Sequence, residues 1–119
     1  MATMNKVIEQ VDGVKPNTFG PEEKFLWLSN LEGMVRRLVM QEKEVVPYEY
    51  PKDMDRELLV GEPFDGIYAL YLEAQIDLHN REYNEYNNSV ALFNSMYEEF
   101  KKAYIRENMP VSAGPIKNL

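Results

Sequence analysis

The side chains best placed to carry chemistry lie between residues 73 and 79. Glu73 and Asp77 are four residues apart, so a helix would present both carboxylates on one face, and His79 follows closely. Two carboxylates held together can share a proton or bind a metal ion. A di-metal site in a helical bundle needs a Glu-x-x-His pair on each of two helices, but Ile76 follows Glu73 by three residues and the chain has one histidine. We therefore interpret Glu73 and Asp77 as a solvated strip on a largely buried helix, and His79 as a surface residue near its end.

No other set of residues has the spacing of a known catalytic or metal-binding motif. From Asp53, an EF-hand calcium loop would need Gly at its sixth position and Glu at its twelfth, where the chain has Leu58 and Phe64. Gly-rich phosphate loops, Gly-x-Ser-x-Gly elbows and His-Glu-x-x-His zinc motifs do not occur in the sequence. The chain has no cysteine, which excludes disulfides, thiolate metal sites and cysteine nucleophiles. We expect a protein that is not an enzyme and needs neither a cofactor nor a metal ion.

Charge argues against nucleic-acid binding and is unevenly distributed along the chain. The formal net charge is −7, whereas phosphate binding needs clustered Lys and Arg. Arg36 and Arg37, with Lys24 a few turns earlier, are the one basic patch on a long helix, and we expect surface ion pairs there. Residues 1–100 carry 9 Lys or Arg against 19 Asp or Glu. Residues 101–119 are basic instead, with Lys101, Lys102, Arg106 and Lys117 against Glu107 alone.

The sequence has no feature of a membrane or secreted protein. Its first residues lack the basic stretch and apolar core of a signal peptide. The longest apolar-rich run, residues 67–72, is far shorter than the roughly 20 residues of a membrane-spanning helix. We expect a protein that works inside a cell and without a membrane.

Apolar periodicity predicts an all-α fold with four helices in one domain. A short helix covers about residues 4–12, and a second covers about residues 21–40, with Gly20 as its N-cap. The third helix opens at Pro63 and is apolar almost all round, so we expect it to be the central one. Residues 80–81 are expected to form a tight turn that separates the third helix from the fourth.

The fourth helix has the most regular pattern in the chain. Apolar residues recur every three or four positions, at Tyr83, Tyr86, Val90, Phe93, Tyr97, Phe100 and Tyr104. The pattern predicts a helix of about 26 residues that ends before Met109-Pro110. Coiled-coil seams favour Leu, Ile and Val over aromatic rings. We therefore expect this seam to pack in the protein's own core, with a seam partly shared with another chain as the alternative.

Between residues 41 and 62 the periodicity stops. Pro47 and Pro51 limit this stretch to an edge strand or an extended loop, and so long a connection is often functional. Its apolar side chains need burial, either on the protein's own bundle or against another chain, and the sequence leaves both open. The fold predicted is a small four-helix bundle over residues 1–107, with this connection between helices two and three and an extended C-terminal tail over residues 108–119.

Several segments resemble the small head–tail connector, or adaptor, proteins of tailed phages and prophages of Gram-positive bacteria. They span most of the chain and are residues 9–17 (EQVDGVKPN), 27–29 (WLS), 62–68 (EPFDGIY), 71–77 (YLEAQID), 82–89 (EYNEYNNS), 93–94 (FN) and Tyr97. The resemblance is one of pattern and contains no catalytic motif.

The family implies that many copies form a ring, dodecameric in the virion, docked beneath the portal protein. Such a ring extends the DNA channel, joins head to tail, and offers a platform for the next connector or tail protein, with DNA only as passing cargo. The location implied is the head–tail junction of the virion, after synthesis in the cytoplasm of the bacterial host.

A ring contact is heterologous, because one surface of each subunit meets a different surface of its neighbour. The acidic body and basic end of this chain would supply complementary surfaces for that contact. Surplus negative charge facing the channel would repel phosphates and let DNA slide. The candidate partner contacts lie in the connection and the C-terminal part, at Val45, Val46, Tyr48, Tyr50, Leu58, Leu59, Lys101, Lys102, Arg106 and Ile116.

The alternative function is a small helical protein-binding module, an assembly chaperone or regulator that acts through the aromatic face of the fourth helix. An adaptor should assemble into rings or bind a portal. A chaperone should remain small and bind an unassembled client.

Overall fold

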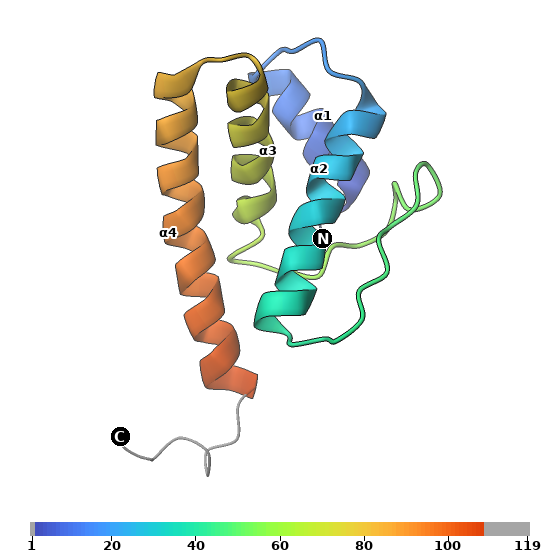
Figure 1. The fold of residues 1–119 in the computed structure, drawn as a ribbon, viewed down its shortest axis with the longest axis vertical. Coiled ribbons are helices and arrows are strands. Elements are labelled where there is room, and N and C mark those ends of the chain that lie inside the picture. The colour runs from blue at the N-terminus through green and yellow to red at the C-terminus, as the bar shows by residue number, and fades with distance from the viewer. Residues whose placement is uncertain (1, 109–119) are drawn as a thin grey trace.

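The computed structural model describes residues 2–108, which form four α-helices. In chain order these are α1 (Met4–Val14), α2 (Pro21–Met34), α3 (Gly66–His79) and α4 (Tyr83–Asn108), with α2 continuing into a short π-helix, η1 (Val35–Val39). Figure 1 shows α3 at the centre, with α4 on one side and α1 and α2 on the other. The predicted all-helical bundle with a long connection between its second and third helices is confirmed. Of the predicted tail, all but Asn108 lies outside the described residues.

The helix starts follow from local hydrogen bonding and charge. Thr3 caps α1, because its side-chain oxygen accepts a hydrogen bond from the backbone N–H of Lys6 at 3.2 Å. Gly20 is the N-cap of α2 and Pro21 its first residue, as predicted. The start predicted for the third helix was wrong by three residues. The chain makes a turn first, with the N–H of Phe64 bonded to the carbonyl of Gly61 at 3.0 Å, and α3 begins only at Gly66.

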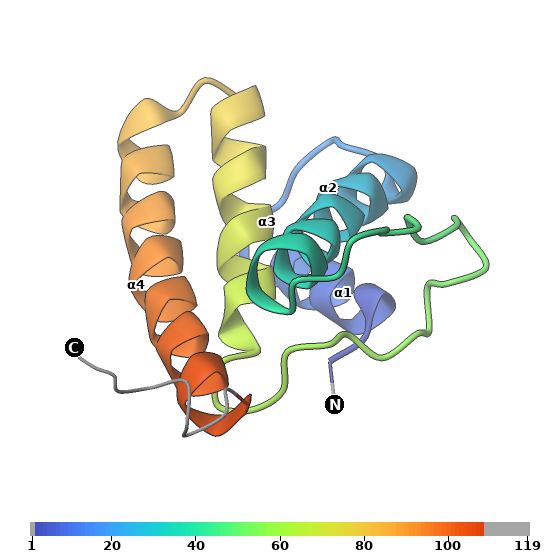
Figure 2. The same cartoon turned by 60° about the horizontal axis from the view of Figure 1, so that its bottom comes forward.

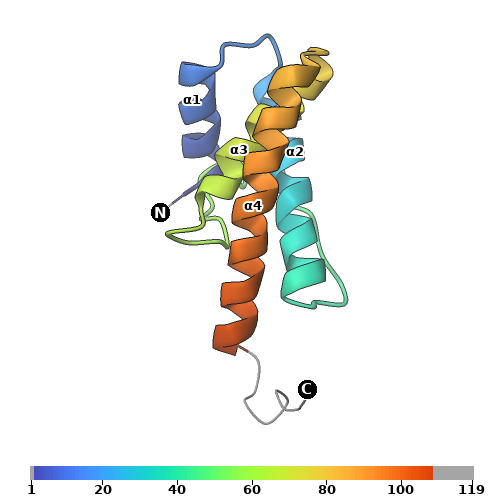
Figure 3. The same cartoon turned by 90° about the vertical axis from the view of Figure 1, so that its left-hand side faces the viewer.

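The core is built around α3, which packs most extensively on α4. Ile67, Tyr68, Leu72 and Ile76 of α3 are all fully buried. Gly66 allows the two helices to approach closely, since a Cβ atom there would lie 3.1 Å from the sulfur of Met96. Figure 3 shows α4 in front of α3, with α1 and α2 to either side behind it.

Aromatic rings fill the contact between α3 and α4. Phe93 and Tyr97 stack with ring centroids 5.3 Å apart, and Tyr71 of α3 packs on Phe93 at the same distance. Phe100 lies 6.1 Å from Phe64, just before α3. The middle of the predicted seam therefore packs in the protein's own core, as expected, whereas Tyr83 at its start is exposed.

Candidate functional site

Asp77 is not solvated, so that prediction was wrong. Its side chain is completely buried on α3, where Lys15 donates a hydrogen bond to Oδ1 at 2.8 Å and Ser89 donates one to Oδ2 at 3.3 Å. The hydrogen bond to Asp77 raises the pKa of Lys15. Because Lys15 follows α1 and Ser89 belongs to α4, this ion pair joins three parts of the chain. Its role is structural.

His79 is exposed at the end of α3, as predicted, but it is packed on other rings. It stacks on Trp27 with ring centroids 4.7 Å apart, and the ring of Phe19 lies edge-on to it at 6.0 Å. These contacts attach the end of α3 to α2 and to the segment before it. No group of three His, Asp or Glu side chains within residues 2–108 is arranged to hold a metal ion.

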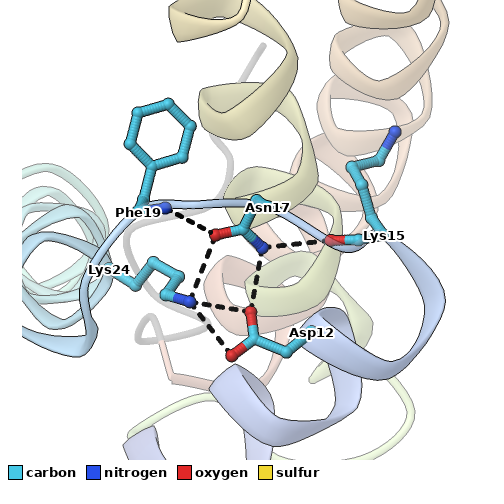
Figure 4. Close-up of polar contacts among 5 residues, drawn as sticks. All are labelled: Asp12, Lys15, Asn17, Phe19 and Lys24. Carbon is cyan, nitrogen blue, oxygen red and sulfur yellow. Dashed lines mark hydrogen bonds and ion pairs between the residues drawn. The ribbon is translucent and has the colours of Figure 1, made fainter.

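Lys24 is buried, so it does not belong to a surface basic patch. Figure 4 shows its ammonium group between Asp12 and Asn17. It donates to the two oxygens of Asp12 at 2.8 and 3.0 Å and to Oδ1 of Asn17 at 3.2 Å. Asn17 in turn donates to Asp12 and to the carbonyl of Lys15, and it accepts from the N–H of Phe19. This cluster fixes the loop between α1 and α2.

The two arginines of η1 behave differently from each other. Arg36 forms the expected ion pair, with its guanidinium 3.0 Å from the carboxylate of Glu42. Arg37 instead donates to the backbone carbonyls of Glu42 and Lys43 at 3.3 and 3.0 Å. Both therefore fix the start of the connection, and the charge of Arg37 stays at the surface.

A buried carboxylate, that of Glu32, helps to attach the connection to the bundle. Glu32 lies on α2 with 1% of its surface exposed, and it accepts hydrogen bonds from the hydroxyls of Tyr68 and Tyr48, the latter at 3.0 Å. It also accepts one from the N–H of Leu59 at 3.0 Å. The N–H of Val60 donates to the Tyr68 hydroxyl at 2.9 Å, which completes the cluster.

Burial sets the proton affinities in this cluster. Loss of solvent raises the pKa of the Glu32 carboxyl, and the hydrogen bonds from the two tyrosines and from Leu59 oppose that shift. Burial also raises the pKa of Tyr48 to about 12, with the nearby Glu32 carboxylate adding to the effect. The tyrosines thus remain hydrogen-bond donors at neutral pH.

Sequence reasoning missed Glu32, although a signal was present. Glu32 follows Leu28 by four residues and precedes Val35 by three, so it lies on the apolar face of its helix. A carboxylate at such a position needs hydrogen-bonding partners. Its partners Tyr48 and Tyr68 are 16 and 36 residues away, which local spacing cannot reveal.

Further backbone contacts hold the connection on the bundle. The N–H of Leu58 donates to the carbonyl of Ala2 at 2.9 Å, and the N–H of Asn5 donates to the carbonyl of Met54 at 2.9 Å. The N–H of Tyr48 donates to Oγ of Ser29 at 3.2 Å. Of the two possibilities left open by the sequence, the connection therefore folds over its own bundle. Figure 2 shows it running past α2 and α1.

The candidate contact residues of the connection divide into two groups. Leu58 is buried and Val45 and Tyr48 are half-buried, whereas Tyr50 is 36% exposed although its ring packs on Phe25 with centroids 5.4 Å apart. Val46 and Leu59 remain exposed, at 72% and 42% of their surface. The connection thus presents a few apolar side chains on a backbone that is held in place.

The basic end is partly neutralised within its own helix. Lys101 lies 3.0 Å from Glu98 and over the ring of Tyr97, and Lys102 lies 3.4 Å from Glu99. Arg106 is exposed. Ile116 lies outside the described residues.

Among the hollows on the surface, one beside α2 and one between α3 and α4 are largely apolar. The first, of about 490 Å³, is lined by Asn30, Gly33, Met34, Arg37, Leu38, Lys43 and Val45. The second, of about 410 Å³, is lined by Pro63, Phe64, Leu70, Leu92, Ser95, Met96 and Glu99. Both are bordered by exposed leucines, and exposed apolar surface of this kind suits contact with another protein.

No helix within residues 2–108 is long and apolar enough to cross a membrane. Comparison of the chain with protein-family models, with curated proteins and with solved structures gives no match.

Proposed function

We propose that this protein is a virion structural protein, a head–tail connector of a tailed phage or prophage. Many copies would form a ring beneath the portal protein, extend the DNA channel, and join the head to the next connector or tail protein. The function would then consist of binding other protein chains, with no reaction catalysed and no cofactor needed.

The observation that carries the proposal is the meeting point of the segments that resemble the connector family. Lys15, Asp77 and Ser89 come from residues 9–17, 71–77 and 82–89, and their side chains meet in one buried ion pair. Segments that are far apart in sequence thus share one structural role. The segments that carry the resemblance therefore belong to one folded domain, which a resemblance over most of the chain requires.

Surface properties are also consistent with a connector. The chain is acidic, with a formal net charge of −7, so DNA in the channel would be repelled by most of its surface. Val46 and Leu59 are exposed on a connection that is fixed to the bundle. A pre-organised apolar segment loses little conformational entropy when it binds a partner such as the portal.

The alternative, a binding module that acts through the aromatic face of α4, has less support. Phe93, Tyr97 and Phe100 are buried against the rest of the bundle. A partner could reach their rings only if α4 separated from α3, where most of the packing lies. An exposed surface on α2, α4 or the connection is the better candidate.

The test is the solution mass of the purified protein, alone and mixed with the portal protein of the same genome. We expect a discrete ring-sized species in at least one of the two samples, measured by sedimentation velocity and viewed by electron microscopy. A protein that stays monomeric and ignores the portal would contradict the proposal, and binding to a single unassembled client would favour the alternative.

A further inference from the structure

One stripe of α2 is exposed along the whole helix and into η1. Glu23, Leu26, Asn30, Gly33 and Arg37 recur at intervals of three and four residues, so they lie on one face. All of them are exposed except Gly33, which is half-buried. The helix lies at the edge of the bundle, on the side of α3 away from α4 (Figure 1). Within residues 2–108, this stripe is therefore left accessible to another molecule.

Two hollows lie beside the stripe, between α2 and the connection. The C-terminal hollow, of about 490 Å³, has Gly33 and Val45 in its lining, and the N-terminal hollow, of about 550 Å³, has Tyr50 in its lining. Two exposed leucines belong to the same side of the helix, Leu26 at 57% and Leu38 at 64%. The face thus carries both the protrusions and the hollows of an apolar contact.

The face fits a second copy of itself when two copies of α2 pack antiparallel about a two-fold axis near Asn30. At 1.5 Å per residue, Leu26 and Met34 lie roughly 6 Å from Asn30, in opposite directions along the helix. Leu26 of each copy then faces Met34 of the other, in the C-terminal hollow. Leu38 and Glu22 lie roughly 12 Å from Asn30, so Leu38 faces the N-terminal hollow of the other copy. Each exposed leucine therefore has a hollow opposite it.

The charges of the stripe are also complementary in this arrangement. Glu23 and Arg37 lie seven residues to either side of Asn30, so each faces the other across the axis. Within residues 2–108, Glu23 forms no salt bridge. Arg37 donates to the backbone carbonyls of Glu42 and Lys43, which carry no charge. Two copies packed in parallel would instead place like charges together.

We infer that two copies of this chain form a symmetric dimer through this face of α2. The contact is isologous, because the same residues of both copies form it. Neighbours in a ring all point the same way and cannot pack antiparallel, so the dimer is a state of the free protein and does not rest on the proposed connector function. The contact involves little more than one helix and the edge of the connection from each copy. We therefore expect a weak dimer that dissociates on dilution.

The absence of cysteine allows the dimer to be trapped by a disulfide. Asn30→Cys places one thiol beside the two-fold axis, and Asn94→Cys, at an exposed position on α4, is the matched control. Under mild oxidation at equal concentration, Asn30→Cys should form disulfide-linked dimers about tenfold faster than Asn94→Cys, because the contact raises the effective concentration of its thiols. Non-reducing gel electrophoresis measures both rates.

Removal of the leucines tests the apolar part of the contact. Leu26→Ala with Leu38→Ala, added to Asn30→Cys, should slow trapping to the control rate, because the hollows lose the side chains that fill them. Leu92→Ala removes a similarly exposed leucine from α4 and should leave the trapping rate of Asn30→Cys unchanged. Sedimentation velocity of the same leucine variants without cysteine should show the same difference in dimer content.

Charge reversal tests the direction of packing. Glu22→Lys with Glu23→Lys gives both ends of the stripe a positive charge, and Arg37→Glu gives both ends a negative charge. With Asn30→Cys present, each variant should be trapped slowly by itself, since like charges meet across the axis. An equal mixture should recover fast trapping, in dimers that contain one chain of each variant, as mass spectrometry would show.

The inference is overturned if Asn30→Cys is trapped no faster than Asn94→Cys, or if loss of the two leucines leaves its trapping rate unchanged. Failure of the charge-reversed mixture to recover trapping, while both variants keep their helical circular dichroism, would overturn the antiparallel arrangement. Slow trapping of Asn30→Cys together with loss of portal binding by the leucine variant would also overturn the dimer, and would assign this face of α2 to the portal protein.

Discussion

The two sides of the molecule are stabilised by different kinds of contact. On the α4 side, α3 is held by aromatic side chains that contact one another in series, among them Tyr71, Phe93, Tyr97 and Phe100. On the α2 side, the connection is held largely by directional hydrogen bonds, two of which end on the buried carboxylate of Glu32. The first arrangement spreads its stabilisation over many atoms in contact, and the second depends on a small number of hydrogen bonds with fixed geometry.

This difference implies that the contact between α3 and α4 supplies stability, whereas the connection supplies a surface that can serve for binding. Packed rings tolerate small changes in shape and depend little on pH, because burial of apolar area is non-directional. A hydrogen-bonded carboxylate fixes one backbone arrangement, and the loss of one partner leaves others unsatisfied. The connection can therefore be altered while the helices remain folded.

The largest effect is expected at Phe100. Phe100→Ala should lower the free energy of unfolding by about 3–5 kcal/mol, because it removes a buried ring and leaves a cavity between the two helices. Urea unfolding followed by circular dichroism measures the change. Leu92→Ala on the exposed side of the same helix is the control and should change stability by less than about 0.5 kcal/mol. Equal effects at the two positions would contradict the packing of the Phe100 aromatic ring between α3 and α4.

A smaller and more local effect is expected at Glu32. Glu32→Gln should cost about 1–3 kcal/mol, because an amide nitrogen facing the Tyr68 hydroxyl leaves a buried donor without an acceptor. Hydrogen exchange should accelerate at the amides of Leu59 and Val60 more than in α4. Glu23→Gln, an exposed change on the same helix, should leave both exchange rates unaltered. Uniform acceleration throughout the protein would show that the carboxylate does not act on the connection in particular.

The cost of Glu32→Gln should also change with pH. Burial raises the pKa of Glu32 above its ordinary value of 4.5 in the folded protein. Protonated Glu32 therefore contributes its full free energy of stabilisation below pH 4.5, and this contribution is lost as the pH rises through the folded pKa. The wild-type advantage over Glu32→Gln should therefore shrink as the pH rises above 4.5, since glutamine does not titrate. Parallel urea titrations of both proteins measure it. An advantage that grows with pH would mean that the hydrogen bonds outweigh burial.

The smallest effect, of opposite sign, is expected at Tyr97. Its hydroxyl is buried and has no hydrogen-bond partner among residues 2–108. Tyr97→Phe keeps the ring and removes the unsatisfied group, so it should raise the free energy of unfolding by up to about 1 kcal/mol. Thermal unfolding is a sufficient measurement, with Tyr48→Phe as a contrast that should destabilise because its hydroxyl is bonded to Glu32. A destabilised Tyr97→Phe variant would indicate a partner for that hydroxyl.

The helices could be predicted from local features of the sequence, but the polar clusters could not. Gly20 and Pro21 at the start of α2, and the spacing of rings along α4, are local signals and gave the correct elements. Asp77 was misjudged because its partner, Lys15, is 62 residues away and nothing nearby indicates burial. The attachment of the connection to Glu32 depends on a similar long-range contact. Whether Val46 and Leu59 meet a partner depends on chains beyond this one.

The most direct test asks whether assembly with the portal requires the attachment of the connection to Glu32. Glu32→Gln should keep its helices, as measured by circular dichroism, but should bind the portal poorly, because its connection is held less firmly around Tyr48 and Leu59. Ile76→Val, a fully buried change expected to cost about 0.5–1.5 kcal/mol, is a control that lowers the stability of the core without touching the connection, and it should assemble normally. The measurement is the mass of each variant mixed with the portal protein under conditions in which both variants are folded. Loss of the ring-sized species for Glu32→Gln alone is the predicted result, and equal assembly by both variants would contradict the account.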